Sequence, residues 1–434
     1  MSSTPMPPPA VTSQRGLAGT AQLILLLMLF AAFGHFNRVG ISVAGTEVFI
    51  PKYGLSETRM GWVYTTFLIV YTLGMLPAGW LIDLIGSSRA LTLYGVLMGL
   101  FVVATGILGW LTSAPETLWI GLLVIRGIAG LCNAPLHPGA AHVVSHYVAE
   151  PRRAAANGLV TAGALVGIAL SYPLFGALMD RLGWPFAFIV SGIALCLYGL
   201  LWNRLTRDLA AAHRNETEVH DSGRGIDWRL LVDRNLWLLS ISYAGYGYFQ
   251  YLFFYWMDYY FKTVLKVASV DARWASFGIM LAMGAGMAVG GLLTDLVGHL
   301  WGASRGRRAI VVVGMGLGAV FGLIGVNLTS LMPVAICLAL SMAALGMCEG
   351  VFWTTATDLG GRSRGFAGAF MNTWGNLGGL ISPVLTPAMA QALGWSGSFA
   401  VACAIAAAGG AVWFLIRLAP AAGSTAWPQE VPRA

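Results

Sequence analysis

Residues 31–45 read Ala-Ala-Phe-Gly-His-Phe-Asn-Arg-Val-Gly-Ile-Ser-Val-Ala-Gly and place one arginine, Arg38, inside an otherwise apolar run that we expect to cross a membrane. An arginine at the centre of a spanning helix costs at least about 2.5 kcal/mol unless it faces a wet cavity or a partner. We therefore predict that Arg38 belongs to a functional site. The alternative is an arginine that reaches a lipid head group or locks two helices together.

The composition around this stretch is that of a membrane protein. Of the 434 residues, 57% are hydrophobic and only 10% are charged, and the mean hydropathy is +0.73. Charged residues make up about a quarter of an ordinary soluble domain. The 56 glycines suit helices that pack closely and bend. The composition therefore excludes an ordinary soluble domain.

The net charge of +7 would suit a nucleic-acid-binding protein, but the positions of the Lys and Arg residues indicate membrane topology instead. Most of them fall in loops on one side of the predicted spans, and the positive-inside rule makes that side cytoplasmic. We expect both termini in the cytoplasm, a location in the cytoplasmic membrane, a monomer, and no nucleic-acid partner. The cationic residues that we place on the outer side are Lys52, Arg59, Arg181, Lys262, Lys266 and Arg273.

The five cysteines lie in apolar segments, at spacings that suit neither a disulfide framework nor a metal cluster. We expect them to pack in the core, and we predict no metal and no cofactor. The first hydrophobic segment is too long for a signal-peptide core and lacks an obvious cleavage site, so we expect no processing.

Apolar runs of about 20 residues, the length of a membrane-spanning helix, number twelve along the chain. They centre near residues 32, 72, 101, 128, 166, 195, 248, 285, 319, 345, 379 and 408, and one long hydrophilic interval follows the sixth. We predict an all-α integral membrane protein with two six-helix halves. Its predicted parts are a cytoplasmic tail at 1–19, a first half at 20–206, a linker at 207–235, a second half at 236–418 and a tail at 419–434.

The two halves repeat the same marker residues at a nearly constant distance, as expected of a duplicated unit. The paired residues lie 210 to 213 positions apart. The pairs are Gly79, Asp83 and Gly86 with Gly291, Asp295 and Gly298; Arg152, Gly158 and Pro173 with Arg362, Gly368 and Pro383; Gly183, Trp184 and Phe188 with Gly394, Trp395 and Phe399; and Gly34 and Phe36 with Gly247 and Phe249.

The segment from Gly79 through Asp83 and Gly86 to Arg89, its echo at 291–298, and Arg126-Gly127-x-x-Gly130 together resemble the major facilitator superfamily. The resemblance covers about residues 20 to 418. We expect Asp83 to pair with Arg89 and with the positive end of a neighbouring helix, and Asp295 to act likewise in the repeat, so that these residues gate the two halves.

Within that superfamily, the chain resembles the anion:cation symporter family, which includes importers of hexuronates, galactonate and glucarate and the vesicular glutamate carriers. The residues that carry this resemblance are Asn37, Arg38, Tyr71, Gly74, Pro77, Arg126, Ala134, Pro135, Pro138, Trp256, Tyr260, Trp353, Asp358, Asn372, Gly375, Asn376, Gly379 and Pro383.

The resemblance implies that Arg38 binds a substrate carboxylate, with Tyr71 and Asn372 as further polar contacts. A guanidinium suits this role because it is always charged and meets a carboxylate with two parallel hydrogen bonds. Arg126 is the second intramembrane arginine. It has two alternative roles, to attract the ligand or to form a structural or coupling contact. Trp353 and Gln250 complete the predicted substrate site.

The chain departs from the family where protons are expected to bind. Many relatives carry an acid immediately before the first arginine and another seven residues after the second, but this sequence has Asn37 and Asn133. Asparagine forms hydrogen bonds and does not titrate near neutral pH. The departures therefore count against proton symport by the family's usual route, and they raise exchange or facilitated diffusion as alternatives.

Three other groups are candidates for proton coupling. Glu349 lies deep in an apolar run, four residues before Trp353, where removal from water makes a carboxyl hold a proton more readily. The alternative is a fixed ion pair between Glu349 and one of the two arginines. His35 and His137 titrate near neutrality as free side chains, and the alternative for each is a hydrogen-bonded packing residue.

The segment 243–260 is the most aromatic part of the chain, and packing or an interfacial belt accounts for most of its rings. Gln250, Tyr251 and Trp256 are the candidates for a cavity. Asp258 stands where relatives often have proline, and near the outer surface it is a candidate for gating.

We predict a secondary transporter that moves a small organic anion, a sugar acid or another carboxylate, by alternating access with proton coupling. The alternatives are an anion exchanger or facilitator, a sensor that kept the fold, and a cation carrier if Glu349, Asp258 and Glu47 face the cavity. The short linker argues against a sensor. No nucleophile with a base and no metal site stands out, so we do not expect an enzyme.

Overall fold

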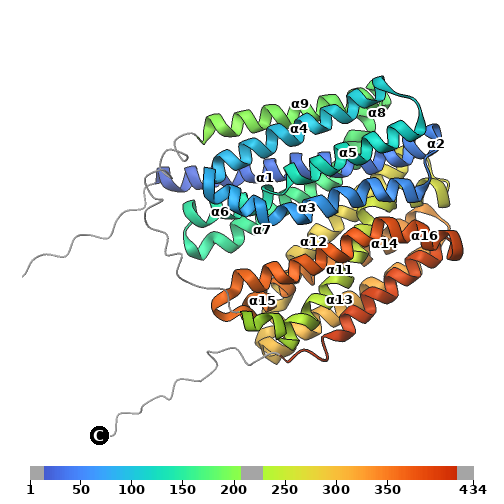
Figure 1. Cartoon of the computed structure of the whole chain (residues 1–434). Helices are drawn as coiled ribbons and strands as arrows, with labels where there is room; N and C mark the ends of the chain where they lie inside the picture. The colour runs from blue at the N-terminus through green and yellow to red at the C-terminus, as the bar shows by residue number, and fades with distance from the viewer. Residues whose placement is uncertain (1–13, 207–227, 418–434) are drawn as a thin grey trace, which may run out of the picture.

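The structure is a computed structural model of the chain that describes residues 14–206 and 228–417. Most of the predicted N-terminal tail and linker, and the predicted C-terminal tail, lie outside the described residues. The described part is helical throughout and contains no strand, which confirms the predicted all-α class. Figure 1 shows two bundles of long helices side by side, the first blue to green and the second yellow-green to red.

The first bundle is built from residues 14–206. Its elements are α1 (Gln14–Ala44), the π-helical turn η1 (Gly45–Phe49), α2 (Ile50–Tyr53), α3 (Glu57–Ile85), α4 (Ser87–Leu111), α5 (Pro115–Asn133), α6 (Leu136–Tyr147), α7 (Glu150–Leu170), the π-helical turn η2 (Ser171–Phe175), α8 (Gly176–Leu182) and α9 (Trp184–Leu205).

The second bundle is built from residues 228–417. Its elements are the 3₁₀ turn η3 (Trp228–Val232), α11 (Arg234–Tyr259), the π-helical turn η4 (Tyr260–Val264), α12 (Ser269–Trp301), α13 (Ala303–Val326), α14 (Leu331–Gly346), α15 (Glu349–Gly360), the 3₁₀ turn η5 (Gly361–Ser363) and α16 (Arg364–Val412).

The helices run back and forth between two ends of the molecule. We call the end at which α1 begins and α9 and α16 finish the terminal end, and the opposite end, which carries η1 and η4, the far end (Figure 1). Side-chain caps set some of the helix starts. The Ser56 hydroxyl accepts from the Arg59 amide before α3, and the Asp233 carboxylate accepts from the Leu236 amide at 2.7 Å before α11.

Glycines with positive φ make the sharp turns between consecutive helices. Gly183, with φ 79°, divides α8 from α9, and Gly394, with φ 71°, bends α16 into two arms at the equivalent place of the second bundle. The corresponding turn pair between the second and third crossings is Gly86 and Gly302, whose φ angles are 83° and 86°. The sequence repeat matched Gly86 with Gly298 instead, which lies inside α12, about one turn before the helix ends.

Small residues let the same pair of helices cross closely in both bundles. In the first bundle, a methyl group on Gly167 of α7 would overlap the carbonyl of Ala32 in α1. In the second, a methyl group on Gly378 of α16 would overlap the carbonyl of Ala244 in α11. Close backbone approach through small residues is how membrane helices pack without a hydrophobic driving force.

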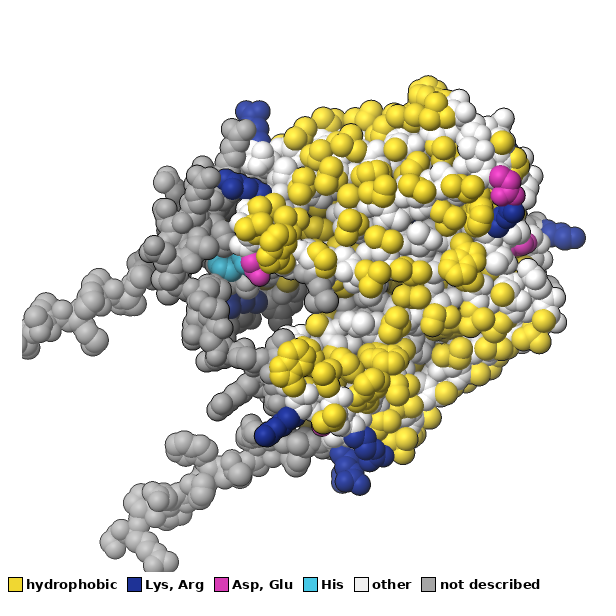
Figure 2. All heavy atoms as spheres, viewed as in Figure 1, with side chains coloured by type: hydrophobic (Ala, Val, Ile, Leu, Met, Phe, Trp, Pro, Cys, Tyr) yellow, Lys and Arg dark blue, Asp and Glu magenta, His cyan; other side chains and the backbone are white. Residues whose placement is uncertain are grey.

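Nine helices of the described part are long and apolar enough to cross a membrane, or ten if the bent helix α3 counts as one span. The bend at Gly394 divides α16 further, and α11 is 26 residues long but rich in tyrosine. Twelve crossings therefore stay a prediction. Figure 2 shows hydrophobic side chains over the sides of both bundles, with charged side chains at the two ends.

The two bundles contact each other mainly through α3 with α16, α7 with α12, and α1 with α11. On the first of these contacts, the Thr65 hydroxyl donates to the Leu380 carbonyl at 2.7 Å, and a methyl group on Gly61 would overlap the Pro383 carbonyl. Figure 2 shows a recess between the bundles at the terminal end, whereas their side chains meet toward the far end. The interface between the bundles is where the candidate site lies.

Candidate functional site

Arg38 of α1 points into the interface between the two bundles and is 5% exposed. Its guanidinium donates to the Tyr251 hydroxyl of α11, in the other bundle, at 2.8 Å. The same group lies over the rings of Phe67, Tyr71 and Tyr251, with centroid distances of 5.3–5.5 Å. Cation–π contacts of this kind stabilise a desolvated cation only in part. Arg38 therefore does not face lipid.

Arg126 of α5 lies directly beside Arg38 and is also buried. It donates to the Arg38 backbone carbonyl at 2.9 Å and stands over the Phe67 ring at 4.4 Å. Its Nε is buried without a hydrogen-bond partner. The structure thus brings together two arginines that are 88 residues apart in the sequence.

Neither arginine has a carboxylate partner among residues 14–206 and 228–417. A buried cation without an acid is costly unless an anion completes the site. The aromatic rings, the Tyr251 hydroxyl and the Arg38 backbone carbonyl supply partial negative charge and leave most of the guanidinium donors available to a ligand. The arrangement is therefore suited to bind a planar anion with two parallel hydrogen bonds.

Asn37 and Asn133, the two asparagines that the sequence singles out, are both buried in the first bundle. The Asn37 amide donates to the Phe33 carbonyl at 2.9 Å and to the Ser191 carbonyl of α9 at 3.4 Å. The Asn133 side chain is buried, and both of its polar atoms lack partners among the described residues. Neither amide forms a hydrogen bond to Arg38 or Arg126 in that part of the chain.

His35 and His137 form a pair beside the arginines, which the sequence did not predict. Their Nε2 atoms are 3.5 Å apart, and His35 Nδ1 lies 3.0 Å from the Ala31 carbonyl. Since a carbonyl only accepts, His35 Nδ1 carries the hydrogen, and in the neutral ring its Nε2 accepts from His137. The pair is therefore arranged to share one proton, one turn from Arg38.

Glu349 begins α15 in the second bundle and is held by two donors. The Tyr243 hydroxyl and the Trp353 indole donate to its Oε1 at 2.9 and 2.8 Å, while its Oε2 is buried without a partner. Within the described residues it makes no ion pair with Arg38 or Arg126, so the alternative of a fixed ion pair does not hold.

The remaining predicted substrate residues divide into two groups. Tyr71 contacts Arg38, as described above. Among the described residues, Gln250, Asn372 and Trp353 do not hydrogen-bond to Arg38: the Gln250 amide meets the Met283 sulfur at 3.7 Å, and Trp353 is 38% exposed beside Glu349. Phe67, which sequence reasoning missed, lies four residues before Tyr71 and therefore on the same helix face.

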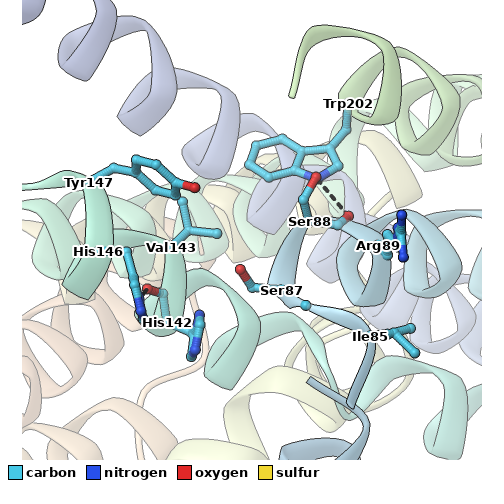
Figure 3. Close-up of a pocket in the computed structure, with 10 residues that line it drawn as sticks. Ile85, Ser87, Ser88, Arg89, His142, Val143, His146, Tyr147 and Trp202 are labelled. Atoms are coloured by element: carbon cyan, nitrogen blue, oxygen red, sulfur yellow. Dashed lines mark hydrogen bonds between the residues drawn. The ribbon is translucent and has the colours of Figure 1, made fainter. Parts of the chain in front are cut away.

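Asp83 and Arg89 flank the turn between α3 and α4 at the terminal end. Both are exposed, and no ion pair joins them in the part of the chain that the structure describes, so the predicted pairing is not formed in this state. Figure 3 shows Arg89 at the rim of a small pocket between α4, α6 and α9, where the Trp202 indole donates to the Ser88 carbonyl at 3.2 Å.

Asp295 is exposed near the end of α12, the equivalent place in the second bundle. It lines a surface pocket together with His299, Arg307 and Thr354. Arg307 is engaged by Asp358 at 2.6 Å instead. The ion pair thus joins α13 to α15 within one bundle.

The far end carries a cluster of four charged side chains that crosses the interface between the bundles, which we call the far-end cluster. Arg273 of α12 donates to Glu47 at 2.8 Å and to Asp180 at 3.0 Å, and Lys262 lies 3.4 Å from Glu47. Arg273 is 3% exposed. The sequence predicts only that Arg273 lies on the outer side. Its ion pairs are not predicted, because the partners lie 226 and 93 positions away and no local pattern marks them.

The chain is similar in sequence to several bacterial transporters. It is 26% identical to the D-galactonate transporter of Escherichia coli O6:H1, over 92% of this chain and 96% of that protein. It is 26% identical to the probable sulfoacetate transporter of Cupriavidus necator, over 86% of this chain and 87% of the relative. It is 25% identical to the probable galactarate/D-glucarate transporter of Bacillus subtilis, over 86% of each chain.

A solved structure and a family profile agree with this fold. The crystal structure of a bacterial homologue of the human lysosomal transporter Spinster, in an inward-facing and unoccupied conformation, superimposes with a TM-score of 0.72 at 16% identity, covering 93% of this chain and 97% of that one. The profile of the Major Facilitator Superfamily matches residues 24–381. The resemblance seen in the sequence is confirmed: the chain belongs to the major facilitator superfamily of multi-pass membrane transporters.

Proposed function

We propose that the protein transports a small organic anion, a sugar acid or a related carboxylate, and that Arg38 and Arg126 attract and bind it. The observation that carries this proposal is the pair of buried arginines without an acid partner in the described chain. The relatives support it, because galactonate, galactarate, glucarate and sulfoacetate are all small organic acids.

In the proposed site, the substrate carboxylate accepts two hydrogen bonds from Arg38 and replaces the Tyr251 hydroxyl as its acceptor. Tyr71 and Tyr251 keep the guanidinium in place from either side of the interface. Gln250, Asn372 and Trp353 contact parts of the substrate away from the carboxylate. The net positive charge of the site selects anions over neutral sugars.

The places where the bundles touch support the proposal that transport occurs by alternating access. The ion pairs that cross the interface in the described chain all belong to the far-end cluster, so this state is closed at the far end. The opposite state requires that the far-end cluster breaks and that the terminal end closes, where Asp83, Arg89 and Asp295 are placed to act as gating residues. By the positive-inside rule, the terminal end faces the cytoplasm and the protein lies in the cytoplasmic membrane.

We propose further that protons drive uptake through the His35–His137 pair, with Glu349 as a second carrier. The pair takes the place of the two missing acids because a proton bound there would sit one turn from the anion on Arg38. An anion on Arg38 offsets the repulsion between that guanidinium and a charged imidazole. Substrate and proton would therefore favour each other's binding. The protein acts as a monomer in which residues 20–206 and 236–418 form the two moving halves, and it needs no cofactor and catalyses no reaction.

A second candidate function is anion exchange or facilitated diffusion without protons. The observation that favours it is Asn37, whose hydrogen bonds to two backbone carbonyls are those of a packing residue. An exchanger would move labelled substrate against unlabelled substrate and would ignore a pH gradient.

The test is uptake into proteoliposomes that contain the purified protein, with radiolabelled D-galactonate, D-glucarate and sulfoacetate and with neutral galactitol as the uncharged control. We expect uptake of at least one acid, none of galactitol, and loss of uptake in Arg38→Ala. An imposed inward proton gradient should concentrate the acid above its outside level. Normal acid uptake by a folded Arg38→Ala protein contradicts the assignment of Arg38 to the binding site. Uptake that does not respond to the proton gradient supports the exchange mechanism.

A further inference from the structure

Asp258, near the end of α11, is a second buried acid that the transport site does not use. It is 1% exposed, and both of its carboxylate oxygens are buried without a hydrogen-bond partner among the described residues. Glu349, by contrast, has two donors to one of its oxygens. A fully buried carboxylate with no donor is among the most unfavourable groups that a protein can contain, and such a group takes up a proton rather than stay charged.

The cations that would be expected to pair with Asp258 are engaged elsewhere. Lys262 lies four residues farther along the same chain, one helical turn away, but it pairs with Glu47 at 3.4 Å. Arg273, which belongs to the same bundle, is held by Glu47 and Asp180. Both acids come from the other bundle. The far-end cluster therefore balances two cations with two anions, and none of the ion pairs of the described residues includes Asp258.

Two further groups interact electrostatically with Asp258, the hydroxyls of Tyr64 in α3 and Tyr172 in η2, and neither is charged near neutral pH. The charged groups that act on the Asp258 carboxyl are Glu47, Lys262 and Arg273 of the far-end cluster. The Tyr172 hydroxyl is used by the Phe254 carbonyl at 3.0 Å. The Tyr64 hydroxyl has no partner among the described residues. In this state the neutral, protonated form of Asp258 is the one that fits its surroundings.

We propose that Asp258 binds one proton when the far end closes and releases it when the far end opens. When the bundles separate there, Glu47 and Asp180 move away with the first bundle, while Lys262 and Arg273 remain on the bundle of Asp258. The carboxyl then meets water and two free cations, loses its proton to the solution on the far side, and replaces the departed acids as their counter-ion. Closure reverses each step and takes one proton from that solution. This proposal rests on the alternation between two states that we propose above.

The consequence is that acid on the far side favours the closed far end. If one proton is taken up on closure, the equilibrium constant between the closed and open far end changes by up to about tenfold per pH unit. Asp258→Asn mimics the protonated carboxyl and removes this dependence. The site differs from the His35–His137 pair because it lies on the other bundle and follows the position of the far end, with or without substrate.

The experiment measures the width of the far end as a function of pH. Cysteines replace Ser113 and Thr329, two exposed residues in far-end loops of the first and second bundle, in a protein whose native cysteines are replaced. Spin labels on these two cysteines report the distance between the bundles by double electron–electron resonance spectroscopy in lipid nanodiscs. We expect the long-distance population to increase at least several-fold between pH 5.5 and pH 8.5, and Asp258→Asn to stay in the short-distance state at both values.

Asp271→Asn is the matched control, because Asp271 is an exposed acid at the same end in the first turn of α12. It should keep the pH response of the parent protein. A pH response that survives in Asp258→Asn, or one that Asp271→Asn abolishes, overturns the proposal. A response to Na⁺ at constant pH in place of the response to protons overturns it as well. The uptake test is separate: a protein that transports acids but shows no pH-dependent far end contradicts only the role of Asp258.

Discussion

At the scale of single residues, two cations are buried where no acid of the described residues neutralises them. Arg38 and Arg126 both lie over the Phe67 ring, and ring faces, one tyrosine hydroxyl and the Arg38 backbone carbonyl stabilise them. The far-end cluster shows that this chain also pairs arginine with acids, as Arg273 does with Glu47 and Asp180. The contrast supports the proposal that an anionic ligand completes the site at Arg38.

The His35–His137 pair gives the first prediction at this scale. His137→Gln keeps a polar side chain and removes the shared proton, so we expect accumulation driven by a proton gradient to be lost. A gradient of one pH unit concentrates a substrate up to about tenfold for each coupled proton, and the variant should reach no more than the outside level. Exchange of labelled for unlabelled substrate should persist, because it needs no net proton movement. The measurement is the steady-state ratio of inside to outside substrate in proteoliposomes.

His299→Gln is the control for this prediction, since His299 is an exposed histidine at the terminal end. It should accumulate substrate as the parent protein does. If His137→Gln accumulates substrate normally, the proton must travel by another group, and Glu349→Gln becomes the variant to compare.

At the scale of helices, packing between small residues decides how closely the elements approach. Two glycines of α7 give opposite predictions for the same substitution. Gly167→Ala would drive a methyl group into the Ala32 carbonyl, and overpacking of this kind costs about 1–3 kcal/mol. Gly158→Ala meets nothing within 4 Å and gains about 0.5–1 kcal/mol of helix propensity. Thermal unfolding in detergent should show a lower midpoint for the first and an unchanged or higher midpoint for the second. Equal midpoints would contradict the close crossing of α1 and α7.

The sequence predicts the helices better than their contacts. Gly183 and Gly394, matched by the repeat, both form positive-φ turns, because a turn between two spans is a local feature that glycine marks. The repeat pairs Gly86 with Gly298, but the residue that forms the equivalent turn is Gly302. The difference arises because α12 extends about one turn past Gly298, and because glycines are frequent enough that another one lies at the expected spacing.

The sites show the same limit. The sequence alone singles out Arg38, because one charge in an apolar run is visible there, and the structure places its side chain between the bundles, while its role in binding stays a prediction. The pairing of His35 with His137 and that of Glu47 with Arg273 were not predicted, because the partners are 102 and 226 residues apart and only the fold brings them together.

At the scale of the whole molecule, the far-end cluster holds the two bundles together in this state. Glu47→Gln removes one of the two acids that hold the buried Arg273, while Asp180 stays as its partner. Loss of a hydrogen-bonded charge contact costs about 1.5–3 kcal/mol. That is a shift of roughly 10- to 100-fold toward the state in which the far end is open. The spin-label distance between positions 113 and 329 should lengthen at every pH.

Asp271→Asn again serves as the control and should leave the distance distribution unchanged. A Glu47→Gln protein that keeps the short distance and transports normally would show that the far-end cluster does not hold the closed state. A protein that loses the short distance and also unfolds would be recognised by its lower unfolding midpoint, and Glu47→Asp, which keeps the charge, should then restore both.

The most direct measurement for the central claim is how well the binding site distinguishes an acid from its uncharged counterpart. Equilibrium binding to purified protein is measured for the acids of the uptake panel and for galactitol, with the parent protein and with Arg38→Gln. A hydrogen-bonded charge contributes about 1.5–3 kcal/mol, so the parent protein should bind its acid roughly 10- to 100-fold more tightly than galactitol. Arg38→Gln should bind both equally weakly while unfolding at the parent temperature. A folded Arg38→Gln protein that keeps the full preference for the acid would contradict the claim that this arginine binds the anion.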